Sequence, residues 1–238
     1  MTSLKQLTVK IFADSADPAR MLELHGKPYI KGLTTNPTLV RKAGIVNYRA
    51  FAREILAKIT DKPVCFEVLA DDFTEMERQA VEIASWADNV YVKIPVTNTR
   101  RATSSALVRR LADQRVKLNV TAIMTLAQVR EMLAALNPAT PSYVSVFAGR
   151  IADTGVDPLP LMAQAVEMLR VNRNAELVWA SSREVFNIFQ ANAIGCPVIT
   201  VTADILSKLP LIGYDLAEYS LDTVKMFHDD AQSAGLSL

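Results

Sequence analysis

Short runs of β-branched and apolar residues recur eight times along the chain, and longer segments with helical spacing separate most of them. The expected strands cover residues 8–15, 29–36, 64–70, 90–96, 116–123, 143–151, 175–182 and 197–204. Strands that alternate with helices pair in parallel. Eight such units in 238 residues predict an α/β fold, a single (β/α)₈ TIM barrel, for which about 250 residues is typical. An open doubly wound sheet is the alternative, and the lack of any break in composition makes it less favoured.

Amphipathic segments between the strands predict helices over residues 47–59, 72–87, 103–113, 125–136, 157–172 and 182–195. Asp72 or Thr74 is expected to cap the second of these, and Gly195 to end the last. We expect residues 1–238 to form one domain, with 216–238 as a C-terminal helical tail. An apolar stripe on this tail would cover the barrel or pack on a neighbouring subunit; its members are Leu221, Val224 and Phe227.

Composition excludes several classes of protein. The formal net charge of +1 gives no electrostatic case for binding nucleic acid or a membrane surface. Cys65 and Cys196 both lie in apolar runs, which fits a reducing cytoplasm better than a disulfide scaffold. We expect no signal peptide and no membrane span, because no apolar run is long enough. His25 and His228 are far apart and have no Cys or His at ligand spacing, so a zinc site is not expected.

Lys93 stands out because it interrupts an otherwise apolar strand, where an ammonium costs several kcal/mol unless it is paired or loses its proton. Side chains two residues apart point to the same side of a strand. By this alternation several strands place a polar group on one face near their ends: Asp14, Glu67, Lys93, Asn119, Thr121, Ser145, and Ser181 and Arg183 in line with Trp179. This predicts a polar cluster at the C-terminal mouth of the barrel, where barrel enzymes carry out their chemistry.

Each of these residues also has a structural alternative. The alternatives are a helix cap for Asp14, an ion pair with Lys93 for Glu67, loop hydrogen bonds for Asn119 and Thr121, solvated strand ends for Arg150 and Arg183, and core packing for Trp179 and Phe147. Lys10 and Lys117 are expected on the outside or at the bottom of the barrel, which shows that a lysine in a strand is weak evidence by itself.

A buried lysine between carboxylates can perform a specific kind of chemistry. Desolvation is expected to lower the pKa of Lys93, and a neutral amine forms Schiff bases with carbonyls. The iminium then draws electrons from the neighbouring carbon–carbon bond, while carboxylates move the protons. Two arginines and a serine suit a phosphate at the other end of the substrate. The set predicts class I aldol chemistry on a sugar phosphate, with no metal and no cofactor.

Five segments together resemble the transaldolase family, including its small fructose-6-phosphate-aldolase-like branch. They are residues 33–40, 90–97, 119–128, 145–151 and 180–183, and the similarity runs in order along nearly the whole chain. The resemblance implies a homo-oligomer, a pentamer or decamer, whose C-terminal helix reaches a neighbour. It also implies that sugar phosphates are the substrates.

The resemblance assigns a role to each matching position. Lys93 matches the Schiff-base lysine, and Asp14 matches the acid/base at the hydroxyl next to the broken bond. Glu67 matches a carboxylate that works through a water, which Thr121 holds. The matches for the dihydroxyacetone pocket are Thr34, Asn36, Asn119 and Ser145, and those for the phosphate site are Arg150, Ser181 and Arg183.

Two positions bear on the type of reaction. The aldolase branch typically has glutamine where Glu67 stands and tyrosine where Phe147 stands, so this chain resembles the transaldolases at both. We therefore expect transfer of a dihydroxyacetone unit from fructose 6-phosphate or sedoheptulose 7-phosphate to an aldose phosphate. The alternatives are an aldolase that releases free dihydroxyacetone, and a barrel that binds a sugar phosphate without converting it.

Overall fold

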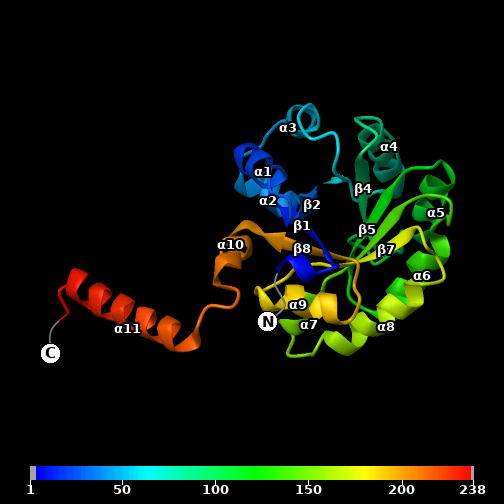
Figure 1. Cartoon of the computed structure of the whole chain (residues 1–238). Helices are drawn as coiled ribbons and strands as arrows, with labels where there is room; N and C mark the ends of the chain where they lie inside the picture. The colour runs from blue at the N-terminus through cyan, green and yellow to red at the C-terminus, as the bar shows by residue number, and fades with distance from the viewer. Residues whose placement is uncertain (1–3, 237–238) are drawn as a thin grey trace.

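The computed structural model describes residues 4–236 and confirms the barrel (Figure 1). All neighbouring strands are parallel, and the sheet closes in the order β1 to β8. The strands are β1 (Lys10–Asp14), β2 (Ile30–Thr34), β3 (Val64–Glu67), β4 (Val90–Pro95), β5 (Leu118–Ile123), β6 (Ser142–Val146), β7 (Ala175–Trp179) and β8 (Val198–Thr202). The fold is therefore a (β/α)₈ TIM barrel followed by a C-terminal helix.

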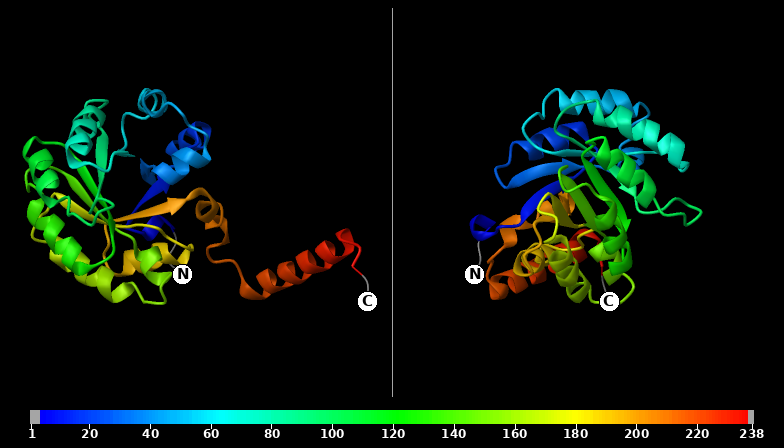
Figure 2. Two further views of the ribbon diagram at one scale, coloured as in Figure 1. Left: turned by 180° about the vertical axis from the view of Figure 1, so that it is seen from behind. Right: turned by 90° about the vertical axis from the view of Figure 1, so that its right-hand side faces the viewer.

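The chain forms helices α1 to α10 around the barrel and a last helix, α11, that extends away from it in the left view of Figure 2. They are α1 (Pro18–His25), α2 (Pro37–Lys42), α3 (Tyr48–Leu56), α4 (Phe73–Ala84), α5 (Ser105–Asp113), α6 (Leu126–Ala135), α7 (Ala148–Ala152), α8 (Leu159–Leu169), α9 (Phe186–Ala193), α10 (Ala203–Leu206) and α11 (Leu216–Ser233). Short 3₁₀ helices cover Leu4–Gln6 and Leu209–Leu211.

Local sequence explains where several helices begin and end. Asp72 caps α4 by accepting hydrogen bonds from two backbone N–H groups, so Thr74 is not the cap. Gly195 follows α9 with a φ of 72°, a left-handed conformation that glycine adopts without strain. The cap of α1 is Asp17, which excludes Asp14 from that structural role.

All eight strands are shorter than predicted, and for two of them the difference moves residues of the site. The sixth ends at Val146, and α7 begins at Ala148, so Arg150 lies on a helix rather than on a strand end. The seventh ends at Trp179, whose backbone pairs with Val146 while Val178 pairs with Ser145. Trp179 therefore faces the surrounding helices, and the prediction that it shares a face with Ser181 and Arg183 is wrong.

Aromatic side chains fill the barrel interior below its C-terminal mouth. The Phe12 ring meets Tyr143 edge to face at 5.4 Å, and the Tyr91 and Tyr143 ring centroids lie 4.5 Å apart. Gly32 lets Phe12 approach β2, because a Cβ at Gly32 would lie 2.5 Å from the ring. This layer with Cys65 forms a packed floor under the polar residues at the mouth.

Lys10 and Lys117 lie at the N-terminal end of the barrel. Lys10 pairs with Glu176, and Lys117 lies over the Tyr91 ring, 5.9 Å from its centroid. Both side chains are partly exposed at the starts of their strands, on the opposite side of the floor from Lys93. They are thus barrel-bottom lysines.

The last helix, α11, projects away from the barrel in Figure 1 and in the left view of Figure 2. It has no buried residue, and Leu221, Val224 and Phe227 are all exposed. The helical tail was expected to reach Leu238, but residues 237 and 238 lie outside the described part of the chain. Among residues 4–236 no helix is both long and apolar enough to cross a membrane.

Candidate active site

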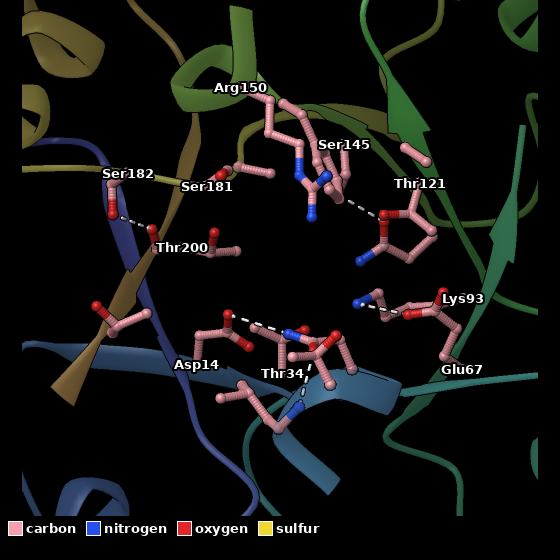
Figure 3. A pocket seen from close by; sticks show the side chains of 18 of the residues that line it. Asp14, Thr34, Glu67, Lys93, Thr121, Ser145, Arg150, Ser181, Ser182 and Thr200 are labelled. Carbon is pink, nitrogen blue, oxygen red and sulfur yellow. Dashed lines mark hydrogen bonds and ion pairs between the residues drawn. The ribbon is translucent and has the colours of Figure 1, made fainter. Parts of the chain in front are cut away.

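A cavity of about 510 Å³ opens at the C-terminal ends of the strands. Every residue predicted for the site lines it: Asp14, Thr34, Asn36, Glu67, Lys93, Asn119, Thr121, Ser145, Phe147, Arg150, Ser181 and Arg183. Figure 3 shows the Lys93 amine and the Asp14 carboxylate facing the same space from different walls, with Arg150 reaching in from another side. The barrel thus gathers residues that are more than 160 positions apart in sequence.

Lys93 is buried in β4 and held by two oxygen atoms. Its Nζ lies 3.0 Å from Glu67 Oε2 and donates a hydrogen bond of 2.8 Å to the carbonyl of Thr35. The register of the sheet makes the ion pair, because Glu67 on β3 pairs directly with Lys93 on β4 and both side chains point inward. The structural alternative for Glu67, an ion pair with Lys93, therefore describes its actual contact.

The charge on Lys93 differs from the expectation. Burial lowers the pKa of Lys93, as predicted, but the carboxylates of Glu67 and Asp14 outweigh burial and raise the pKa above its usual value. The resting side chain is therefore an ammonium. To act as a nucleophile it has to release a proton during the reaction.

Asp14 lies at the end of β1 and combines a raised pKa with an oxygen atom that has no hydrogen-bond partner among the described residues. Burial raises the pKa of Asp14 to about 6, opposed by the positive charge of Lys93 and reinforced by the charge of Glu67. Its Oδ1 is buried and has no hydrogen-bond partner among the described residues. A carboxylate with a raised pKa and an unused oxygen is equipped to accept a proton from a ligand near neutral pH.

Asn36 connects the start of α2 to Asp14. Its Oδ1 caps the helix by accepting from Leu39 N at 3.0 Å. The cap fixes the amide so that its Nδ2 faces the cavity and lies 3.4 Å from Asp14 Oδ2. Pro37 begins α2 directly afterwards, where a missing N–H costs nothing. The local sequence therefore fixes a polar amide beside the carboxylate.

Thr121 sits where β5 departs from regular geometry. The pairing of β5 with β6 shifts after Val120, and Ala122 has a φ of 62°, so Thr121 and Ala122 both line the cavity. The Thr121 Oγ1 atom is buried without a hydrogen-bond partner among the described residues. A buried hydroxyl without a partner suits a polar ligand atom or a water.

Asn119 and Ser145 form a polar network next to Lys93. The Ser145 hydroxyl donates to Asn119 Oδ1 at 2.7 Å, and Asn119 Nδ2 contacts Cys65 Sγ at 3.5 Å. Asn119 therefore bonds to other interior side chains and not to loop backbone, contrary to its structural alternative. The network fixes the amide and the hydroxyl on adjacent strands.

The cationic side of the cavity depends on a close backbone contact. Gly149 in α7 packs against Ser181, and a Cβ at Gly149 would lie 1.6 Å from the Ser181 carbonyl oxygen. Ser181 has a φ of 62°, which turns the chain into the cavity after β7. The contact brings Arg150, the residue after Gly149, next to Ser181.

The two arginines differ in their partners. Arg150 lies over the Phe147 ring, with its guanidinium carbon 5.7 Å from the centroid. Arg183 forms an ion pair with Asp153, and both side chains are about half exposed. An anion at this end of the cavity would meet Arg150 directly and share Arg183 with Asp153.

Sequence reasoning missed some residues that line the cavity, including Thr200, Thr202 and Ser182. The alternation in β8 could have found the threonines, because Thr202 pairs with Asp14 and Thr200 with Phe12. Ser182 donates to the Thr200 carbonyl at 2.8 Å. No sequence signal pointed to this contact, because it depends on the left-handed turn at Ser181.

Comparison with known proteins agrees with this geometry. Residues 11–238 match the Transaldolase/Fructose-6-phosphate aldolase family. A probable transaldolase of Dehalococcoides mccartyi is 33% identical over 218 residues, which is 90% of this chain and 97% of that protein. A probable transaldolase of Thermoanaerobacter sp. is 32% identical over 231 residues, 97% of this chain and 100% of that protein. A probable transaldolase of Methanococcus maripaludis is 32% identical over 218 residues, which is 90% of this chain and 97% of that protein. The chain thus belongs to the transaldolase/fructose-6-phosphate aldolase family, and it is an enzyme of the transaldolase or aldolase type.

Proposed function

We propose that this enzyme is a transaldolase, which transfers a dihydroxyacetone unit between sugar phosphates through a Schiff base on Lys93. The observation that carries the proposal is a buried lysine, 3.0 Å from Glu67, in a cavity that Asp14 also lines. A barrel that only binds sugar phosphate has no need for a buried ammonium, which is costly to desolvate.

The first step forms the Schiff base. Lys93 releases one proton through a water next to Thr121 and Glu67, while Glu67 Oε2 keeps its contact with the amine. The amine nitrogen attacks the C2 carbonyl of the ketose phosphate to give a carbinolamine. A proton returned by Glu67 lets the C2 hydroxyl leave as water, and an iminium remains.

The second step breaks the carbon–carbon bond. Asp14 takes the proton of the C4 hydroxyl, the C3–C4 bond breaks, and its electron pair moves into the iminium to give an enamine. The aldose phosphate leaves, and an acceptor aldehyde reacts with the enamine by the reverse steps. The raised pKa of Asp14, about 6, gives this carboxylate more basicity than a solvated aspartate has.

Substrate binding divides between the two sides of the cavity. We assign the dihydroxyacetone hydroxyls to Thr34, Asn36, Asn119 and Ser145. We assign the phosphate to Arg150, Ser181 and Arg183. Fructose 6-phosphate and sedoheptulose 7-phosphate are the proposed donors, and aldose phosphates such as erythrose 4-phosphate are the proposed acceptors. We place the reaction in the cytoplasm, because both cysteines are free and buried.

We also propose that the enzyme is a homo-oligomer, with α11 packing on a neighbouring copy. The helix carries exposed Leu221, Val224 and Phe227 and has no buried residue of its own. An apolar stripe of this kind is unfavourable in water unless it is covered. Pentamers and decamers are the proposed assemblies, by resemblance to the small branch of the family.

Borohydride reduction in the presence of fructose 6-phosphate should give a covalent three-carbon or six-carbon adduct on Lys93, because reduction traps an iminium. Peptide mass mapping locates the adduct, and Lys10 and Lys117 serve as internal controls that should stay unmodified. If Lys93 carries no adduct in a folded sample, the Schiff-base mechanism is wrong.

Asp14→Asn should abolish most of the cleavage activity and at the same time stabilise the protein at neutral pH. The folded-state pKa of Asp14 is about 6, above its usual 3.8, so the wild type loses stability as the pH rises from about 4 through 6. The variant escapes this penalty, so its advantage in unfolding free energy should grow over this window to roughly 1–3 kcal/mol. Urea unfolding at pH 4 and pH 7.5 measures it. An advantage that is equal at both pH values would contradict the raised pKa.

Phe147→Tyr should shift the enzyme toward release of free dihydroxyacetone. A tyrosine hydroxyl at this position would help water protonate the enamine, whereas the phenylalanine ring cannot. The ratio of release to transfer, measured with and without an acceptor aldehyde, should rise several-fold. Phe147→Leu is the matched control, because it changes the side chain without adding a hydroxyl. A ratio that is the same in all three proteins would disprove this account of Phe147.

Val224→Asp should lower the molar mass of the particle in solution, because it puts a charge into the apolar stripe of α11. Met226→Asp is the matched control, since Met226 is also exposed but lies on the other side of the helix. Light scattering after size-exclusion chromatography measures the mass. A monomeric wild type, or equal effects of both substitutions, would contradict the proposed interface.

A further inference from the structure

The pairing of β2 with β3 stops one hydrogen bond early at the active site. Leu33 N donates to Pro63 O at 2.9 Å, and Thr35 N donates to Cys65 O at 3.2 Å. In a regular parallel ladder the next bond joins Glu67 N–H to the Thr35 carbonyl. Both groups are instead bonded elsewhere.

Tyr48 takes the first of these groups. The Glu67 N–H donates to the hydroxyl oxygen of Tyr48 at 3.0 Å. The Thr35 carbonyl then accepts Lys93 Nζ at 2.8 Å, with a longer contact of 3.5 Å from the Thr34 hydroxyl. The Tyr48 hydroxyl thus replaces the Thr35 carbonyl as the acceptor for the Glu67 N–H, and the carbonyl is left for Lys93.

The Tyr48 ring is held firmly enough to keep this position. Tyr48 is the first residue of α3, and its ring centroid lies 6.0 to 6.3 Å from those of Phe51, Phe66 and Trp86. Burial raises the pKa of its hydroxyl, so Tyr48 stays neutral. The hydroxyl is therefore a fixed acceptor between α3 and the end of β3.

The Thr35 carbonyl matters because it helps to orient the lysine. A neutral amine has two N–H groups and one lone pair. With one N–H directed to Glu67 and the other to Thr35, the lone pair points away from both oxygen atoms. Figure 3 shows that the remaining direction from Lys93 is the open cavity. Without the carbonyl, the amine could rotate its lone pair away from a substrate.

We propose that Tyr48 is a positioning residue for Lys93. Its hydroxyl binds the Glu67 N–H, which keeps the Thr35 carbonyl available to hold and orient the lysine nitrogen. The part of this inference that concerns reaction rate rests on the proposed Schiff-base function. The part that concerns the hydrogen bond to Lys93 does not.

Tyr48→Phe tests the proposal by removing the hydroxyl and keeping the ring. The Glu67 N–H is then expected to bond to the Thr35 carbonyl and complete the ladder, so Lys93 loses an acceptor. Because that acceptor favours the ammonium, the pKa of Lys93 should fall by about one pH unit. Trace labelling with acetic anhydride across a pH series, followed by peptide mapping, measures this titration without any sugar substrate.

Kinetics give a second measurement on the same variant. We expect kcat to fall about tenfold, which corresponds to one misplaced hydrogen bond at the reacting atom, while KM changes less than about twofold. Phe51→Leu is the control, because it alters the same aromatic cluster and removes no hydrogen bond. It should lower the melting temperature and leave both the labelling titration of Lys93 and kcat unchanged.

The outcomes separate the two proposals. If wild-type Lys93 is not trapped by borohydride, the Schiff-base function fails, and the labelling titration still decides the role of Tyr48. If Lys93 titrates at the same pH in the wild type, Tyr48→Phe and Phe51→Leu, Tyr48 does not position Lys93. A lower titration midpoint in Tyr48→Phe alone supports the proposal.

Discussion

The site depends on the cost of keeping an ammonium inside an apolar barrel. Lys93 is buried above a floor of aromatic side chains, and an unpaired charge there costs several kcal/mol. Glu67 and the Thr35 carbonyl provide the compensation; Glu67 is the last residue of β3, and Thr35 directly follows β2. The position of the lysine therefore constrains how β2, β3 and β4 pair, and not only what lines the cavity.

The same neighbours also explain why Lys93 is protonated. Burial alone favours a neutral amine, but two carboxylates facing one lysine favour the ammonium. Burial raises the pKa of Asp14 to about 6, although the positive charge of Lys93 opposes this rise, so Asp14 can exchange a proton near neutral pH while Lys93 stays protonated. Burying these charged groups makes the protein less stable than an apolar core at the same place would. Such a loss of stability is typical of catalytic clusters.

The barrel and most of the site could be predicted from the sequence, because both rest on alternation. Period-two patterning identified the eight strands, and parity put Asp14, Glu67 and Lys93 on one face, as the register confirms. The same reasoning failed at Trp179, because parity holds only inside a strand and the chain leaves β7 at that residue.

The pKa of Lys93 could not be predicted in the same way. Its direction depends on an ion pair at 3.0 Å, and a sequence pattern gives the face of a residue but not its distances. The role of Tyr48 was also missed. Its helix, α3, directly precedes β3, but the Tyr48 hydroxyl acts on a backbone N–H, which no side-chain motif records.

In the proposed mechanism, the fate of the enamine depends on the groups that surround it. An enamine on Lys93 would be released only if a proton reached its carbon before an aldehyde did. The hydroxyls of Tyr91 and Tyr143 in the floor are weak acids, because burial raises the pKa of both. The Phe147 ring, engaged by Arg150, has no hydroxyl to deliver a proton. The acidic groups that remain are Asp14 and Glu67, and each has a position fixed by its partners, Asn36 for one and Lys93 for the other. In the proposed mechanism, restricting the proton donors to two fixed carboxylates is therefore the physical basis on which this barrel would favour transfer over release.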